Sequence, residues 1–428
     1  MNEGVMTKTS AVAVFNGRRV LVWGAIALFM VCMPLIFKQS FALSMLSQMG
    51  IAIIFALSYN MLLGQTGLLS FGHAVYYGLA AFICAHTLNT MAAGKFNIPV
   101  TLLPLVGGVS GLIFGILLGY VTTRRAGTPF AMISLGIAEL VAASALMFPA
   151  FFGGEGGIAT NRQIGQAWHG LSYGPQIQVY YLIAGWCFIC MIAMYALTQT
   201  PLGRIANAVR DNPERARFVG YDPTRVRYLM LCLAAFFAGV AGALGTINYE
   251  IVTAENVGVT ASGNVLIMAF IGGVGYFFGP VIGAVLVTFL QSALSSYTQA
   301  WLLSFGLFFV IMVMFAPGGI ASLVMVHAPA WRERLMMRLL PSYALSGLAL
   351  LVMFGGGVAL VEMIYHVETG ADKAFRLFGV PLDATQATTW ILATLIFVVG
   401  GVLFSLSLRP VRSAWNDINA ELLKRSAQ

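Results

Sequence analysis

The sequence has 428 residues, of which 59% are hydrophobic and 9% charged, and its mean hydropathy is +0.86. Ordinary soluble domains carry about 25% charged residues, so this composition excludes a soluble globular protein. The formal net charge of +8 does not call for nucleic acid as a partner, because the basic residues are distributed as expected for a membrane protein.

Apolar segments of about 20 residues, each long enough to cross roughly 30 Å of hydrocarbon, recur along the whole chain. They predict an all-α fold, a polytopic integral membrane helix bundle with about 12 spans, of which about 10 precede residue 320 and 2 follow it. The run from Val20 to Phe37 is counted as a span, because no clear cleavage site follows it. The predicted spans cover residues 18–37, 41–63, 67–89, 99–121, 129–150, 177–198, 228–249, 264–278, 280–297, 300–316, 342–361 and 388–408.

The positions of lysine and arginine predict the orientation. With the N-terminus inside and spans that alternate in direction, 18 of the 23 basic residues fall on the inner side, as the positive-inside rule requires. One span more or fewer in the middle of the chain weakens this bias, so an even number of spans is favoured. Both termini are therefore predicted to be cytoplasmic.

A polar, glycine-rich segment lies between the second and third predicted spans and reads GQTGLLSFGHA from Gly64 to Ala74. Its glycines permit a broken helix and close backbone approach, and its polar side chains need partners or a cavity at membrane depth. Two interpretations remain open, a translocation path and tight helix packing with interhelical hydrogen bonds. The candidate residues are Gly64, Gln65, Gly67, Ser70, Gly72 and His73.

Glu139 is the ionisable residue predicted to lie nearest the middle of the bilayer, in the span 129–150. A charged, unpaired carboxylate there costs roughly 2.5–3.5 kcal/mol on insertion scales. We therefore expect its side chain to face the interior of the bundle. It would serve either as part of the translocation path or as a neutral acid bonded to a neighbouring helix.

Residues 200–227 form an arginine-rich island that contains six arginines. A polar residue precedes a proline three times, at Thr200-Pro201, Asn212-Pro213 and Asp222-Pro223, and each pair is typical of a helix start. The island therefore predicts two short helices on the inner side, the first with one apolar and one cationic face, and Gly220 where the second ends. The candidates for coupling to a cytosolic partner are Arg204, Arg210, Asp211, Asn212, Glu214, Arg215 and Gly220.

Later in the chain, glycine and proline interrupt the apolar pattern between residues 264 and 297. Irregular backbone is tolerated at membrane depth only where it is buried in protein or lines a cavity, so we predict short or re-entrant helices there. The interrupting residues are Gly272, Gly273, Gly275, Gly279 and Pro280. The four glycines join the candidates for the translocation path or broken-helix motif.

The sequence offers no recognisable catalytic machinery. It contains no G-x-x-x-x-G-K-[ST] phosphate loop, no H-E-x-x-H and no G-x-S-x-G, and its histidines have no metal-ligand spacing. Cys187 and Cys190 form a C-x-x-C inside an apolar helix, where core packing is the better interpretation. We predict a protein that is not an enzyme and holds no metal or cofactor of its own.

Four motifs together resemble one family. The segment GQTGLLSFGHA is similar to a signature of the branched-chain amino-acid (LIV-type) ABC importer permeases, most of all the LivM branch. The island segment RDNPERARFVGY resembles that family's cytoplasmic loop that docks on an ATPase. GGVGYFFGPVIGA from Gly272 and FAPGGI from Phe315 resemble its late and closing motifs. The resemblance divides the chain into an N-terminal tail and first span (1–40), a permease core (41–325) and a C-terminal extension (326–428).

The resemblance implies a multi-pass permease subunit of the bacterial inner membrane that imports branched-chain or other small amino acids, or related small organic solutes. It implies a second permease subunit, LivH-like or another copy of this chain, and an external substrate-binding protein. It also implies two cytosolic ABC ATPases, which would carry the ATP and Mg²⁺. The alternative is an ion-coupled secondary transporter, which usually has several intramembrane acids, bases or relay residues.

The extension has two predicted spans and a tail. In the tail, Val411, Trp415, Ile418 and Leu422 form an apolar stripe. Such a stripe predicts an amphipathic helix along the inner membrane surface.

Overall fold

The computed structural model describes residues 17–163, 172–297, 300–316, 318–333, 335–369, 374–377 and 380–426. It confirms the polytopic helix bundle. Each of the twelve predicted apolar segments falls on a helix. These helices are α1 (Gly17–Ile36), α2 (Ser40–Thr66), α3 (His73–Ala92), α4 (Leu103–Thr122), α5 (Thr128–Met147), α7 (Gln176–Gln199), α10 (Pro223–Tyr249), α11 (Val259–Gly272), α12 (Gly279–Tyr297), α13 (Trp301–Phe315), α15 (Met336–Glu368) and α16 (Ala387–Ser426).

Seven helices in the described part of the chain are long and apolar enough to cross a membrane, or eight if the bent pair at 301–332 counts as one span. The other apolar helices are shorter or begin later than the sequence pattern predicts. The 14-residue α11 ends at the expected glycines, and α3 begins at His73 rather than at residue 67. The predicted spans are therefore a mixture of complete and broken helices.

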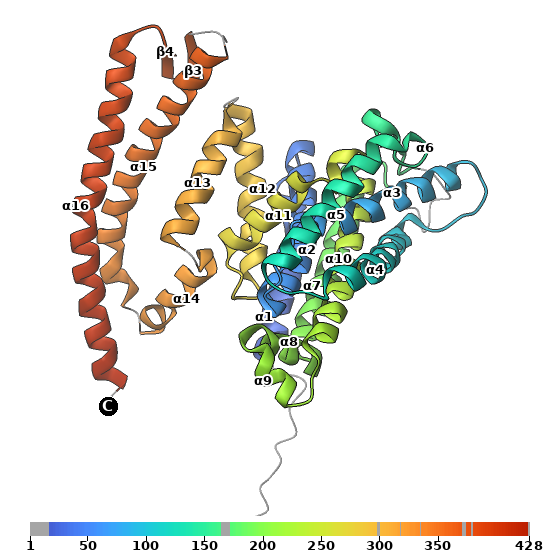
Figure 1. Cartoon of the computed structure of the whole chain (residues 1–428). Coiled ribbons are helices and arrows are strands. Elements are labelled where there is room, and N and C mark those ends of the chain that lie inside the picture. Colours follow the sequence, from blue (N-terminus) through green and yellow to red (C-terminus); the bar gives the residue numbers. More distant parts are fainter. Residues whose placement is uncertain are drawn as a thin grey trace, which may run out of the picture.

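Short elements connect the helices. The antiparallel pair of β1 (Ile158–Ala159) and β2 (Ile251–Val252) lies at one end of the bundle, and β3 (Ala374–Leu377) pairs with β4 (Val380–Asp383) between α15 and α16. At the opposite end lie α8 (Pro201–Asp211) and α9 (Pro213–Phe218) (Figure 1). The remaining elements are η1 (Val100–Leu102), α6 (Pro149–Phe152), η2 (Gly154–Gly156), η3 (Ala254–Val257) and α14 (Gly319–Arg332).

Helix α10 forms the centre of the bundle and packs against α2, α3 and α4. Its inward positions carry small residues, which let helix backbones approach closely in a membrane where apolar burial alone gives no driving force. A Cβ added to Gly239 would overlap with the Gly107 carbonyl of α4, and one added to Gly242 would overlap with the Tyr77 carbonyl of α3. These two glycines therefore determine how close the neighbouring helices come.

The C-terminal extension forms a helical hairpin of α15 and α16 that stands beside α13 and α14 (Figure 1). The sequence predicted a separate surface helix for its tail, and this prediction is wrong. The tail continues α16 to Ser426, and its Ile418 is buried against Leu335 and Leu339. Ion pairs from Arg338 to Glu421 (2.6 Å) and from Arg425 to Glu333 (2.9 Å) join the same ends of the helices.

We predict that Gly239→Ile lowers the melting temperature of the purified protein, because the added side chain would separate α4 from α10. Overpacking of this kind costs about 1–3 kcal/mol. Gly185→Ile on α7 is the matched control, since a Cβ there meets open space. Equal melting temperatures for the two variants would show that the α4–α10 approach does not limit stability.

Candidate functional site

Helix α2 is broken where the glycine-rich segment begins. Gly67 has a φ of 70°, the left-handed conformation that ends helices, and its amide bonds to carbonyls of the last turn. The backbone from residue 67 to residue 72 is not helical, and α3 starts at His73. The predicted broken helix is therefore confirmed, and the break lies inside the protein.

The backbone of this break finds hydrogen-bond partners on several other elements. Irregular backbone at membrane depth requires such partners, because no water is present to replace them. The bonds run from the Tyr59 hydroxyl to the Ser70 carbonyl (3.0 Å), from the Phe71 amide to Ser134 Oγ (3.0 Å), from the Gly72 amide to Ser70 Oγ (3.3 Å) and from the Ala74 amide to Ser262 Oγ (3.0 Å). Sequence reasoning missed Ser134 and Ser262, whose only signal is that each is one of the few hydroxyl side chains in an apolar helix.

His73 is completely buried at the first position of α3. Its Nε2 lies 2.9 Å from Ser58 Oγ, and its ring is stacked on Phe55 (5.5 Å) and contacted by the edge of Tyr59 (5.3 Å). Three buried atoms of this region have no hydrogen-bond partner among the described residues, namely His73 Nδ1, Asn60 Oδ1 and Gln65 Oε1. Such unpaired groups cost about 1–3 kcal/mol each and are rare in native interiors.

Arg210 connects the arginine-rich island to the break. Its Nη1 donates a hydrogen bond to the Gly64 carbonyl, and a Cβ on Gly67 would lie 3.1 Å from Arg210 Cγ. A Cβ on Gly64 would also lie 2.7 Å from the Val274 carbonyl in the turn between α11 and α12. We call Gly64, Gly67, Arg210 and Val274 the junction. It brings together three motifs that the sequence presents separately.

The short helices of the island begin and end as the sequence predicts. Each polar residue before a proline accepts a hydrogen bond from an amide of the first turn. These bonds reach Thr200 from Gly203 (3.4 Å), Asn212 from Arg215 (2.9 Å) and Asp222 from Thr224 (2.9 Å). After α9, Gly220 has a φ of 93°, and the Tyr221 amide reaches back to the Ala216 carbonyl, as in a Schellman motif.

Helix α8 has the predicted two faces. Ala206 and Val209 are fully buried, and the helix packs against α2, α7 and α10. Arg204 and Asp211 are exposed, and Asp211 pairs with Arg210 at 3.0 Å. The buried face fixes α8 to the membrane helices, while the other face is free for a partner.

Helix α9 presents an apolar tip that sequence reasoning did not single out. Phe218 is 91% exposed and Val219 is 70% exposed, and the neighbouring Glu214 and Arg215 are also exposed. Two apolar side chains at the end of a short polar helix are the signal that could have identified it.

The late glycines form the turn between α11 and α12. A Cβ on Gly272 would overlap with the Gly279 carbonyl, and Gly273 has a φ of 111°, so close approach and backbone conformation both require glycine. Gly279 likewise contacts the Gly273 carbonyl. Gly275 differs, because a Cβ there meets open space.

The expectation that Glu139 faces the interior of the bundle is wrong. Its side chain is exposed on α5, while Ser134, Ala138 and Val141 of the same helix are buried. The exposed face continues through Gly136 and Ala143. Glu139 lies near the middle of the 20-residue α5, but the almost uniformly apolar sequence of this helix gives no periodic signal that would reveal which way the side chain faces.

Comparisons with known proteins agree with this arrangement. Residues 41–317 match the family described as branched-chain amino acid transport system / permease component. The chain belongs to this family. It is 28% identical to the high-affinity branched-chain amino acid transport system permease protein LivM of Salmonella typhimurium and 27% identical to that of Escherichia coli, over 63% of this chain and 67% of each relative. It is also 26% identical to the fructose import permease protein FrcC of Rhizobium meliloti, over 47% of this chain and 58% of that protein. No solved structure matches the chain.

The family resemblance seen in the four motifs is therefore confirmed. The chain is a multi-pass membrane protein and a permease component, which works with other components of an ABC transporter. Residues after 317 lie outside the family match. The division of the chain at 40 and 325 stays a prediction.

We predict that Ser134→Ala lowers the melting temperature of the purified protein, because it leaves the Phe71 amide without its acceptor. An orphaned buried donor costs about 1–3 kcal/mol. Ser144→Ala is the matched control on the same helix, since its hydroxyl bonds only to the Leu140 carbonyl of its own turn. A Ser134→Ala variant as stable as the control would show that the break does not depend on this bond.

Proposed function

We propose that the chain is a permease subunit of an ABC importer in a bacterial inner membrane. Its cargo is a branched-chain or other small amino acid, or a related small organic solute. The family match and the names of the LivM relatives support this substrate class. The observation that carries the mechanism is the hydrogen bond from Arg210 in the island to Gly64 at the broken helix.

In this proposal two cytosolic ABC ATPases bind ATP and Mg²⁺ and press on α8 and α9 when they close. The buried face of α8 makes it move together with the inner ends of α2, α7 and α10. Arg210 transmits the displacement to Gly64, where α2 is about to break. The nucleotide then biases an equilibrium between outward-open and inward-open states.

The exposed side of the island fits an ATPase surface with an apolar groove and an acidic rim. Phe218 and Val219 supply the apolar contact, and Arg204 and Arg215 are exposed cations. Apolar anchors surrounded by charges are typical of interfaces in which a few residues supply most of the affinity.

A second permease subunit, LivH-like or another copy, would complete the pathway. We propose that it covers the face of α5 that holds Gly136, Glu139 and Ala143. Small residues favour close helix packing, and an unpaired carboxylate toward lipid costs roughly 2.5–3.5 kcal/mol, which a polar partner would remove. An external binding protein would dock at the opposite end from α8 and α9.

The alternative of an ion-coupled secondary transporter has less support. Among the described residues of α1 to α13, no acidic side chain is buried. Coupling ions need acidic or relay groups along the path, and His73 is the one buried histidine, lysine, arginine or acid among these described residues.

We predict that Arg210→Glu with Arg215→Glu lowers ATP-driven uptake into proteoliposomes by about tenfold or more, since the lost bond and the reversed charges are worth more than about 1.4 kcal/mol. ATP hydrolysis should no longer respond to the loaded binding protein. The control is Arg409→Glu with Arg412→Glu, which changes the same charge at the inner end of the extension. Normal uptake by the island variant, with its ATPases bound, would contradict the proposed coupling.

The α5 interface is tested by cross-linking. A cysteine in place of Ala143 should form a cross-link to the second permease subunit, because the exposed face of α5 is covered there. A cysteine in place of Leu395, on the exposed side of α16, serves as the control. If only the control cross-links, the face of α5 that carries Glu139 borders lipid instead.

A further inference from the structure

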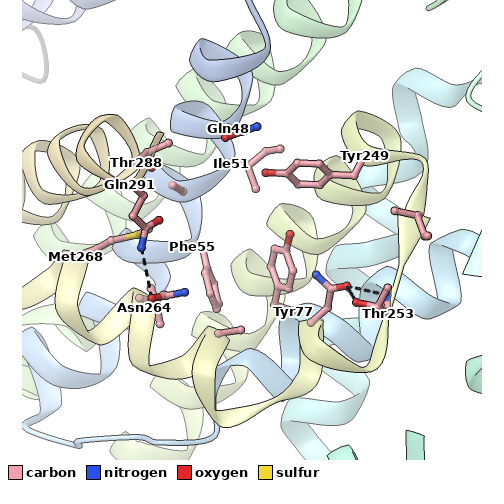
Figure 2. A pocket seen from close by; sticks show the side chains of 15 residues that line it. Gln48, Ile51, Phe55, Tyr77, Tyr249, Thr253, Asn264, Met268, Thr288 and Gln291 are labelled. Atoms are coloured by element: carbon pink, nitrogen blue, oxygen red, sulfur yellow. Dashed lines mark hydrogen bonds between the residues drawn. The ribbon is translucent and has the colours of Figure 1, made fainter. Parts of the chain in front are cut away.

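A cavity of about 390 Å³ lies among α2, α3, α10, α11 and α12. This volume is within the range of small-molecule sites, roughly 300–1,000 Å³. Figure 2 shows Gln291 and Asn264 on one side, Tyr77 and Tyr249 on the other, and Ile51 and Phe55 between them. The motifs recognised in the sequence supply none of the lining residues.

About half of the lining residues are polar, and none carries a charged side chain. Amide and hydroxyl groups surround the space, and the Gln291 amide donates to Asn264 at 3.5 Å. A solute with net charge would lose its hydration here without a counter-charge, at high cost. The polar lining residues are Gln48, Tyr77, Tyr249, Thr253, Asn256, Asn264, Thr288 and Gln291.

One end of the cavity lies at the start of α11. Ala261 lines the space and belongs to the first turn of this 14-residue helix. The first amides of a helix lack intrahelical acceptors and carry partial positive charge. These backbone amides and the side-chain amide of Asn264 can donate hydrogen bonds to a carboxylate. The side-chain amide oxygens and the two tyrosine rings suit an ammonium group.

The rest of the wall is apolar. Ile51, Ala52, Val265 and Met268 border the space between the polar groups, where they can receive an aliphatic side chain. Phe55 lies 4.8 Å from the Tyr77 ring. We call these two rings the floor, because both line the space and Phe55 also stacks on His73, which does not line it.

We propose that this cavity is a substrate chamber for a small aliphatic amino acid in its zwitterionic form, with Phe55 and Tyr77 as its inner gate. The proposal rests on the proposed importer function and adds a site within the permease itself. The gate is joined to the coupling surface, because His73 is the first residue of α3 after the break and Arg210 bonds to Gly64 just before it. Displacement of the break therefore shifts the floor.

The first test fills the chamber. Thr288→Trp should lower leucine uptake by the complete transporter in proteoliposomes by about tenfold or more, a loss of about 1.4 kcal/mol or more in transition-state stabilisation. Val285→Trp is the matched control, because Val285 lies one turn earlier on α12 and is 39% exposed. ATP hydrolysis stimulated by the loaded binding protein should persist in both. Normal uptake by Thr288→Trp, at equal abundance in the membrane, would overturn the proposal.

The second test keeps the volume and changes the chemistry, in case a tryptophan disturbs folding. Asn264→Leu should lower leucine uptake by about tenfold, because the carboxylate of the substrate would lose a charge-assisted hydrogen bond. Gln291→Glu should raise uptake of lysine relative to leucine, with leucine-loaded and lysine-loaded binding proteins compared in parallel. Unchanged leucine uptake by Asn264→Leu, together with an unchanged ratio of lysine to leucine uptake by Gln291→Glu, would overturn the proposed chamber.

The third test addresses the gate. Phe55→Ala should release preloaded leucine from proteoliposomes without ATP, while the wild-type transporter retains it. A Phe55→Ala variant that retains the preloaded leucine as the wild type does would contradict the proposed gate. The proposed importer function would be refuted by a different result, namely the absence of ATP-dependent amino-acid uptake by the wild-type complex. Failure of the chamber and failure of the importer function can therefore be distinguished.

Discussion

The arrangement of this permease depends on one contact, the hydrogen bond from Arg210 to the carbonyl of Gly64. A glycine at this position lets the guanidinium and the Val274 backbone approach the end of α2 together. The contact joins the helix pair α8 and α9, at one end of the bundle, to a break that lies inside the protein. Because α8 packs against three membrane helices, we propose that it moves together with them and that a push on it reaches the break.

The break is stable because the protein replaces the missing helical hydrogen bonds. Tyr59, Ser134 and Ser262 each supply one partner from a different helix. This arrangement fixes the break in place but leaves polar atoms of His73, Asn60 and Gln65 unpaired. The aromatic floor of the cavity rests on this same segment.

Local sequence signals predicted the parts that depend on local physics. The three caps of the island, the turn at Gly220 and the ends of α2 and α11 follow from side-chain oxygens, prolines and glycines acting within a few residues.

Features set by tertiary packing were not predictable. Glu139 lies on the exposed face of α5. The sequence could not show this, because an almost uniformly apolar helix has no periodic pattern from which its rotation can be read. The cavity is equally hidden, since its polar residues come from five helices and from the segment at η3. The tail of α16 shows the same limit: its apolar stripe predicted a surface helix, but the stripe packs against α14 and α15.

The central claim is that nucleotide-driven movement reaches the break through Arg210. It is tested most directly by electron–electron resonance between two spin labels. One label replaces Arg125, which is exposed in the turn between α4 and α5, and the other replaces Gly275, which is exposed in the turn beside the junction. The complete transporter would be measured with its ATPases empty and then trapped with ATP. The account predicts that the distance distribution shifts on ATP binding in the native transporter and stays fixed in Arg210→Ala with the ATPases still bound. The same shift in both would contradict it.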